Sequence, residues 1–192
     1  PQLPIRTDDI IEAEVSYAAK RLKWNKAPGP DGIPAEFWKA ICAPGSPAFH
    51  WAVEFCRRCW AEGCVPDCWH EAVVTAIFKK GDAADCSNYR PISLSAVGYK
   101  LSAIIILKRL REGGAEQRIW PTQFGFRTGH GTDDALFLAR RVLDEAWAQK
   151  NGQAIFLAHD WAKAFDGISP DALLVALGRF GLPARLLTVI ES

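Results

Sequence analysis

The strongest constraint on the fold of this chain is an apolar run that ends in a carboxylate, from Ile155 to Asp160. An Asn-Gly pair at 151–152 predicts a turn, and the Ile-Phe-Leu-Ala segment at 155–158 has the composition of a strand. Strand alternation places Phe156, Ala158 and Asp160 on one face. A carboxylate at the end of an apolar strand is costly to bury unless it binds a metal or a hydrogen-bond donor. The run therefore predicts a sheet strand that ends in either a functional Asp160 or a solvated one.

The length and the charge of the chain limit the classes of protein to which it can belong. Its 192 residues, 49% of them apolar, are enough for one domain with a real core. The net charge of +1 excludes a polycation, but residues 69–111 form a local basic zone. Its cations outnumber the acids Glu71, Asp82 and Asp85, and they are Lys79, Lys80, Arg90, Lys100, Lys108, Arg109 and Arg111. Such a zone suits phosphate, although charge runs also form plain solvated faces.

Targeting signals and cysteines add two further expectations. The chain has neither a signal peptide nor an apolar run of membrane length, so we expect no membrane partner. It also contains no Met, which suggests that it begins inside a longer polypeptide. Cys56-x-x-Cys59 and Cys64-x-x-x-Cys68 permit a zinc site. Reduced thiols without metal are favoured, because only four residues separate the pairs and the first pair falls in a predicted helix.

The first third of the chain is predicted to be helical. One helix is expected from Thr7 to about residue 23, a second over residues 35–41, and a third from Ser46 through Trp60, closed by Gly63. Prolines and glycines exclude a helix from residues 26–33, which are predicted to form a loop. Later in the chain, Thr132 is the predicted N-cap of a helix that ends near residue 150, and Ser169-Pro170 begins a further helix that Gly181 ends.

The next segment predicts a β-hairpin that carries three cations, Lys79, Lys80 and Arg90. Residues 69–80 and 88–94 are predicted to form its strands, and a helix follows over residues 95–111. Lys79 and Arg90 lie on opposite strands.

Four segments resemble, in order, the reverse transcriptases of non-LTR retrotransposons. They are K-x-P-G-x-D-G at residues 26–32, K-x-G-D followed by Y-R-P-I-S-L at 79–94, Q-x-G-F-R at 123–127, and D-x-x-x-A-F-D at 160–166. The resemblance extends from Lys26 to the C-terminus. It implies an α+β fold, namely the fingers and partial palm of a right-hand polymerase, with a helix-rich N-terminal part, a β-hairpin and a palm strand. Residues 1–192 would be one partial domain: a helical extension at 1–68, fingers at 69–130 and the start of the palm at 131–192.

The resemblance also implies a role for individual residues. Asp160 would be the catalytic carboxylate that binds two Mg²⁺ ions, and Phe165 would lie under the sugar of the incoming nucleotide and exclude a 2′-hydroxyl. Lys79 and Arg90 would bind its triphosphate, the ammonium as a point charge and the guanidinium through two hydrogen bonds to phosphate oxygens. The alternative is a pair of exposed basic residues near a turn. Gln123 and Arg127 would help to shape the nucleotide and template site. Alternatively, Phe165 is a core aromatic and Arg127 stacks on the neighbouring Phe rings. His159 departs from the pattern, in which an apolar residue usually precedes the metal-binding Asp.

The activity that the resemblance implies is RNA-directed DNA synthesis, the transfer of deoxynucleotides to a primer 3′-hydroxyl on an RNA template. The partners would be template RNA, a DNA primer and deoxynucleoside triphosphates, inside the cell and in the nucleus for the parent element. The family's second metal-binding motif, Ala-Asp-Asp after an aromatic, is absent. We therefore expect the chain to be inactive alone and its missing C-terminal half to lie in the full-length protein. A non-catalytic nucleotide- or RNA-binding remnant, or an unrelated α+β domain with a structural Asp160, remain as alternatives.

Overall fold

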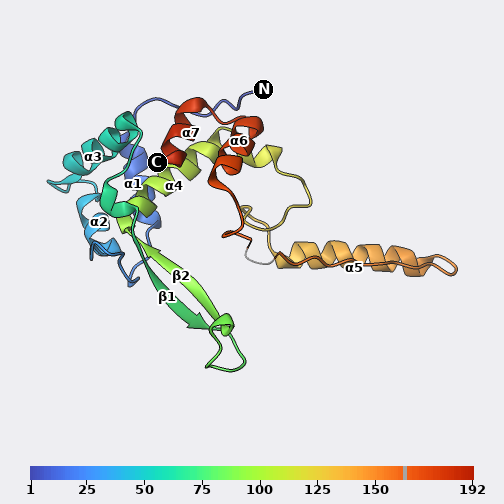
Figure 1. The fold of residues 1–192 in the computed structure, drawn as a ribbon. Helices are drawn as coiled ribbons and strands as arrows, with labels where there is room; N and C mark the ends of the chain where they lie inside the picture. The colour runs from blue at the N-terminus through green and yellow to red at the C-terminus, as the bar shows by residue number, and fades with distance from the viewer. Residues whose placement is uncertain (162–163) are drawn as a thin grey trace.

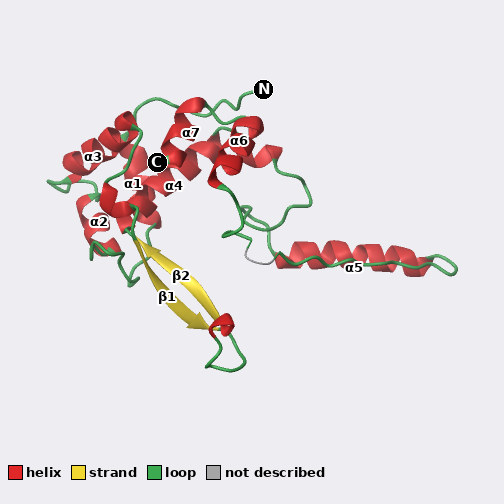
Figure 2. Ribbon diagram, viewed as in Figure 1, coloured by secondary structure: helices red, strands yellow, loops and turns green. Residues whose placement is uncertain are grey.

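The computed structural model describes residues 1–161 and 164–192. In that part of the chain the protein is rich in helix and has one two-stranded antiparallel sheet (Figure 2). The helices are α1 (Glu12–Arg21), α2 (Ala35–Ile41), α3 (Phe49–Glu62), α4 (Val97–Glu112), α5 (Thr132–Ala148), α6 (Pro170–Phe180) and α7 (Ala184–Glu191). The strands are β1 (Ala72–Phe78) and β2 (Tyr89–Ser95), and 3₁₀ turns occupy Asp67–Trp69, Cys86–Asn88 and Ala115–Arg118.

A helical body forms around α4 (Figure 1). Leu101 and Ile105 of α4 are at most 2% exposed, and they belong to the same core cluster as Val15 of α1, Val53 of α3 and Leu186 of α7. Burying an aliphatic side chain of this size stabilises a fold by about 1.5–3 kcal/mol. The core therefore packs helices α1 and α3, near the N-terminus, together with α7 at the C-terminus.

An ion pair lies inside this core. Arg109 of α4 donates from Nε to Glu14 Oε1 at 2.7 Å and from Nη2 to Glu14 Oε2 at 2.8 Å, and both side chains are buried. Arg109 also donates to the carbonyls of Asp8 and Asp9 at 2.7 and 3.0 Å, and its guanidinium lies 4.6 Å from the ring centroid of Trp60. Burial by itself raises the pKa of Glu14, but the hydrogen bonds from Arg109 and from the Ile11 N–H outweigh it, so the net shift is downward.

The basic zone predicted for residues 69–111 is therefore smaller than its sequence indicates. Arg109 is buried in its ion pair with Glu14, Lys108 pairs with Glu112, and Arg111 forms an ion pair with Glu116 at 2.9 Å. The composition of the zone cannot reveal this, because Glu112 and Glu116 lie just beyond its C-terminal end and Glu14 lies 95 residues from Arg109.

An aromatic cluster holds the base of the hairpin against the body. The ring of Trp69, just before β1, lies 5.6 Å from Phe55 and 6.4 Å from Trp38, both edge to face. Gly98 in the first turn of α4 permits this packing, because a Cβ there would lie 2.2 Å from the Trp69 ring. Trp69 is therefore buried in a 3₁₀ turn, and the first strand begins at Ala72, three residues later than the sequence predicts.

Several helix starts differ from their predicted positions. The first helix begins at Glu12 and not near Thr7, because the carbonyls of Asp8 and Asp9 bind Arg109 and Glu14 caps the Ile11 N–H. The Ser46 hydroxyl accepts from the Ala48 N–H, so α3 begins at Phe49.

The start of α5 is offset by one residue. Gly131 is the N-cap, its N–H donates to Asp134 at 2.7 Å, and Thr132 is the first helical residue instead of the predicted cap.

Other boundaries are confirmed. The helix over residues 35–41 has the predicted limits. Gly63 and Gly181 end α3 and α6 with φ of 70° and 107°, which is the left-handed conformation that favours glycine. Ser169 caps α6 by accepting from the Ala172 N–H, and Pro170 occupies the first turn.

Two segments project from the helical body in different directions, the β1–β2 hairpin and α5 (Figure 1). No residue of α5 is buried. After α5 the chain turns and runs back in the opposite direction (Figure 1). No helix in the described residues has the length and apolar character needed to cross a membrane.

The strand predicted at residues 155–158 is wrong for this structure. The described chain forms no strand there, and the exposed fractions of Ile155 and Leu157 are 95% and 77%. A strand exists only when its backbone N–H and C=O groups pair with a neighbour, and the strands β1 and β2 pair only with each other. In the described chain, residues 155–158 therefore have no neighbouring strand with which to pair.

Candidate functional site

The hairpin places the two predicted phosphate-binding cations on one face. β1 and β2 are antiparallel, and Arg90 pairs directly with Ile77. The Lys79 N–H donates to the Asn88 carbonyl at 2.8 Å, which continues the ladder by one pair beyond β1. Lys79 lies two residues after Ile77, and side chains two apart on a strand share a face with the residues paired across from them. Lys79 and Arg90 therefore share a face, while Lys80 lies in the bend that follows the ladder.

The tip of the hairpin is a loop fixed by its own polar groups. Asp82 accepts from the Ala84 N–H, and Asp85 accepts from both the N–H and the hydroxyl of Ser87 at 2.8 Å. These bonds hold the pKa of Asp85 below its usual value. Gly81 has a φ of 97°, so a residue with a side chain would be strained there. Asp82 and Asp85 thus accept hydrogen bonds within the loop, and in the described chain they form no ion pair with Lys79 or Lys80.

The cations of the hairpin remain available to a ligand. Lys79 Nζ donates to the Ser87 carbonyl at 3.2 Å, and Arg90 is exposed. Within the described residues, neither Lys79 nor Arg90 forms an ion pair with a carboxylate. Two unpaired cations on one face of a rigid ribbon form a suitable site for several phosphate oxygens.

The Asp160 segment is the second part of the predicted site. Asp160 is exposed at the end of the apolar run, and the following residues 162–163 of that predicted motif lie outside the described residues. Phe165 is 79% exposed, so it is not a core aromatic in this structure. Its ring meets Phe126 edge to face at 6.4 Å.

The contact with Phe126 joins the Q-x-G-F-R segment to the Asp160 segment. Phe126 has a φ of 62°, a backbone conformation that is uncommon outside glycine. Its side chain is 94% exposed. Phe126 is not among the predicted site residues, and the signal in the sequence that could have identified it is its position between Gly125 and Arg127 in the Q-x-G-F-R segment.

Gln123 and Arg127 organise their own loop in this structure. Gln123 Nε2 donates to the Gly125 carbonyl at 3.2 Å. Arg127 Nη1 points to the carbonyls of Trp120, Gln123 and Pro121 at 3.1, 3.3 and 3.5 Å. The suggested stacking of Arg127 on neighbouring Phe rings is absent from the cation–π contacts of the described residues. Direct contact of these two side chains with a nucleotide or template stays a prediction.

The two parts of the predicted site do not meet in this structure. The hairpin that carries Lys79 and Arg90 and the segment around α5 that leads to Asp160 are separate projections (Figure 1). That Lys79 and Arg90 bind the triphosphate of the nucleotide while Asp160 binds its magnesium stays a prediction.

Asp160 is a carboxylate of the kind that binds magnesium, but one carboxylate is not a complete ligand set. Mg²⁺ is bound in proteins by carboxylate oxygens together with water and substrate phosphates. Asp160 and Asp166 are both exposed carboxylates. Among the residues that the structure describes, no group of three or more His, Cys, Asp and Glu side chains gathers to hold a metal. The described residues therefore provide some of the carboxylate ligands that a magnesium ion needs, but not a complete set.

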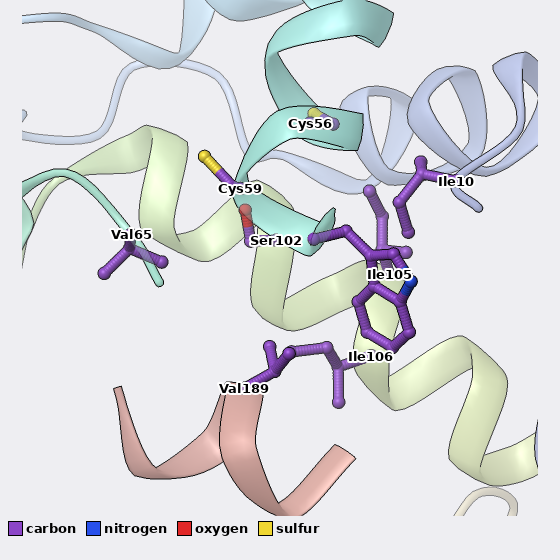
Figure 3. Close-up of a pocket in the computed structure, with 9 residues that line it drawn as sticks. Ile10, Cys56, Cys59, Val65, Ser102, Ile105, Ile106 and Val189 are labelled. Atoms are coloured by element: carbon purple, nitrogen blue, oxygen red, sulfur yellow. The ribbon is translucent and has the colours of Figure 1, made fainter. Parts of the chain in front are cut away.

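The zinc alternative receives no support from the cysteines. All six are free, and Cys56 and Cys59 border a small apolar cavity of about 30 Å³ between α3, α4 and α7, with Ile105 and Val189 opposite (Figure 3). Burial raises the pKa of Cys56 to about 12 and that of Cys59 to about 11. Zinc binds thiolates, so these two thiols are poor ligands.

Comparison with known proteins gives matches across the chain. The family model described as "Reverse transcriptase (RNA-dependent DNA polymerase)" matches residues 77–192. The chain is 33% identical over 180 residues to the transposon TX1 uncharacterized 149 kDa protein of Xenopus laevis. It is 31% identical over 195 residues to the probable RNA-directed DNA polymerase from transposon BS of Drosophila melanogaster. It is 30% identical over 171 residues to the Pol polyprotein from the type-1 retrotransposable element R1 of Bradysia coprophila.

These matches cover 93%, 100% and 88% of this chain but only 13%, 20% and 16% of the three relatives. The chain thus corresponds to a small part of each relative's length.

Proposed function

Because the chain belongs to the reverse transcriptase (RNA-dependent DNA polymerase) family, in its non-LTR retrotransposon branch, we propose that it carries the nucleotide-binding part of an enzyme that copies RNA into DNA. Residues 1–68 form the helical N-terminal extension, residues 69–130 the fingers, and residues 131–192 the start of the palm of a right-hand polymerase. The partners in this proposal are an RNA template, a DNA primer and deoxynucleoside triphosphates. Nuclear localisation of the full-length protein belongs to the same proposal.

The observation that carries the proposal is the hairpin. The family match begins within β1, at residue 77, and the hairpin presents Lys79 and Arg90 on one face, unpaired with acids in the described chain. Lys79 would serve the triphosphate as a point charge, and Arg90 would donate two parallel hydrogen bonds to its oxygens. Together they would orient the nucleotide, which is the main contribution of a protein to phosphoryl transfer.

Asp160 would hold the magnesium that such a reaction uses. When bound, the ion would activate the primer hydroxyl and neutralise charge on the leaving pyrophosphate. The exposed carboxylate lies at the end of a short apolar run, where neighbouring segments can bring in the remaining ligands. The metal-binding set is completed, in this proposal, by residues of the full-length protein that follow the chain.

In the full-length protein, Lys79→Ala and Arg90→Ala are each expected to raise the KM for deoxynucleoside triphosphate by about ten- to a hundredfold. The reason is the loss of one charge-assisted interaction, worth about 1.5–3 kcal/mol. Steady-state primer extension at varied nucleotide concentration measures this change.

Lys80→Ala is the matched control, because Lys80 is the adjacent lysine and lies in the bend beyond the strand pairing. Its KM should stay within about twofold of the parent value. An equal rise in all three variants would mean that general positive charge, and not the Lys79–Arg90 face, attracts the nucleotide.

Replacing Phe165 by alanine or valine in the full-length protein is expected to increase ribonucleotide incorporation relative to deoxynucleotide incorporation by about ten- to a hundredfold. A ring under the sugar leaves no room for a 2′-hydroxyl and offers it no hydrogen-bond partner, so discrimination depends on the ring itself. The exposure of Phe165 leaves its face free for such a contact. Single-nucleotide incorporation with matched ribo- and deoxynucleotides measures the ratio, and an unchanged ratio in a folded, active variant would exclude the gate.

Residues 1–192 alone are expected to add no nucleotides to a primer, because they contain the carboxylate of one metal-binding motif only. A primer-extension assay on the purified chain with magnesium checks this. Incorporation that disappears in the Asp160→Ala variant of the same chain would show instead that the chain is a complete enzyme.

A further inference from the structure

The loop at the tip of the hairpin, residues 80–87, is tied down by two side chains of the returning arm. Asn88 Nδ2 donates to the Asp82 carbonyl at 2.9 Å, and the Tyr89 hydroxyl donates to the Ala83 carbonyl at 2.9 Å. Both side chains are half-buried, whereas the other residues from 79 to 90 are exposed. Two successive residues therefore hold two successive carbonyls on the opposite arm of this tip loop.

The two side chains reach the tip loop from opposite faces of the hairpin. The Lys79 N–H donates to the Asn88 carbonyl at 2.8 Å, so Asn88 lies across the ladder from Lys79 and shares the face of Lys79 and Arg90. Tyr89 lies on the other face, where its ring centroid is 5.4 Å from that of Phe78, its partner in the register. Hydrogen bonds from both faces therefore restrain the tip loop.

The bend of the tip loop depends on Asn88 in particular. Gly81 has a φ of 97°, and a Cβ there would lie 2.9 Å from Asn88 Nδ2. The Asp82 carbonyl accepts from the Asp85 N–H at 3.3 Å as well as from Asn88. Without the Asn88 amide, this carbonyl keeps only the longer of the two bonds. Gly81, which has the widest choice of backbone conformation, is then free to change its φ and ψ.

The tip loop in turn holds the Lys79 ammonium. Lys79 Nζ donates to the carbonyl of Ser87, the residue before Asn88, at 3.2 Å. Ser87 is itself fixed, because its N–H and its hydroxyl both donate to Asp85. The position of the ammonium therefore depends on the shape of the loop. A cation that is placed before the ligand arrives binds it with a lower entropic cost.

We propose that Asn88 and Tyr89 are positioning residues for nucleotide binding, which hold the tip loop in the shape that presents the Lys79 ammonium to the triphosphate. Each acts through Lys79 and not by touching the nucleotide. The proposal rests on the function proposed for the hairpin, and it adds two residues that determine how well Lys79 performs its part.

The test is steady-state primer extension by the full-length protein at varied concentrations of deoxynucleoside triphosphate. Tyr89→Phe removes the hydroxyl but keeps the ring beside Phe78, and Asn88→Ala removes the amide. Each variant is expected to raise KM by about three- to tenfold, the effect of losing one hydrogen bond, with kcat within about twofold of the parent value. Tyr99→Phe is the matched control, because it removes the same atom from an exposed ring on α4, and it should leave both constants within about twofold.

The same substitutions in a Lys79→Ala background separate positioning from a general loss of structure. Because both residues act through the ammonium, Tyr89→Phe and Asn88→Ala should change KM by less than about twofold when Lys79 is already absent. An equal rise in KM with and without Lys79 would overturn the proposal, as would a fall in kcat at unchanged KM.

The Lys79→Ala variant also distinguishes this proposal from the function on which it rests. If Lys79→Ala raises KM while folded Tyr89→Phe and Asn88→Ala proteins keep the parent value, the positioning role is wrong and the nucleotide-binding role of the hairpin stands. If Lys79→Ala leaves KM unchanged, both are wrong.

Discussion

Replacing Glu14 with alanine is expected to lower the free energy of unfolding of the chain by about 3–5 kcal/mol. The variant leaves Arg109 buried with two of its hydrogen-bond acceptors removed and no carboxylate opposite it. A desolvated guanidinium without a counter-charge is among the costliest defects in a core. The expected loss is a large share of the 5–15 kcal/mol that typically separates folded from unfolded states. Urea denaturation followed by circular dichroism measures it.

Glu12→Ala is the matched control, because Glu12 lies on the same helix but is exposed. Its effect should stay within about 0.5 kcal/mol. Similar losses in the two variants would show that helix α1 itself, and not the buried ion pair, accounts for the stability.

The same ion pair predicts acid sensitivity. The pKa of Glu14 is lowered from its ordinary value of 4.5 in the folded protein. Its contribution to stability is therefore complete above pH 4.5 and is lost as the pH falls through the lower folded-state pKa. In Glu14→Ala this part of the acid-induced loss should be missing.

The ends of helices could be predicted from the sequence more reliably than their beginnings. Gly63 and Gly181 end helices because glycine adopts positive φ at little cost, which is a local property. The start of α1 depends on Arg109, a residue about a hundred positions away that binds the carbonyls of Asp8 and Asp9. No local pattern at Thr7 contains that information.

The hairpin and the 155–158 run show the same contrast in β-structure. The two strands of the hairpin are adjacent in sequence, so alternation and turn residues predict their pairing. The apolar run at 155–158 needs partners from elsewhere, and in the described chain it lies exposed with no strand beside it. Its composition predicts the capacity to form a strand, while formation depends on partners that composition does not specify.

The candidate site could likewise be predicted only in part. Motif spacing places Lys79 and Arg90 on paired strands, and the register confirms the pairing. The roles of Lys108, Arg109 and Arg111 could not be read from the sequence, because their acidic partners are defined by helix geometry and tertiary packing. The contact of Phe126 with Phe165 similarly joins segments 39 residues apart that are linked by no local pattern.

Asp160→Asn in the full-length protein is expected to reduce the rate of nucleotide addition by about a thousandfold. The amide has nearly the same shape as the carboxylate but lacks the negative charge that would hold magnesium, and such stabilisation is worth several kcal/mol in the transition state. Because Asp160 is exposed, the substitution should leave the unfolding midpoint unchanged. Asp171→Asn, an exposed aspartate in the first turn of α6, is the matched control and should retain nearly full activity.

The most direct test is extension of a DNA primer on an RNA template by the full-length protein, with magnesium and the four deoxynucleoside triphosphates, beside its Asp160→Asn and Asp171→Asn variants. We predict template-directed DNA synthesis by the parent and by Asp171→Asn, and about a thousandfold less by Asp160→Asn. Synthesis at the parent rate by a folded Asp160→Asn protein, or no RNA-directed synthesis by the folded parent, would contradict the assignment.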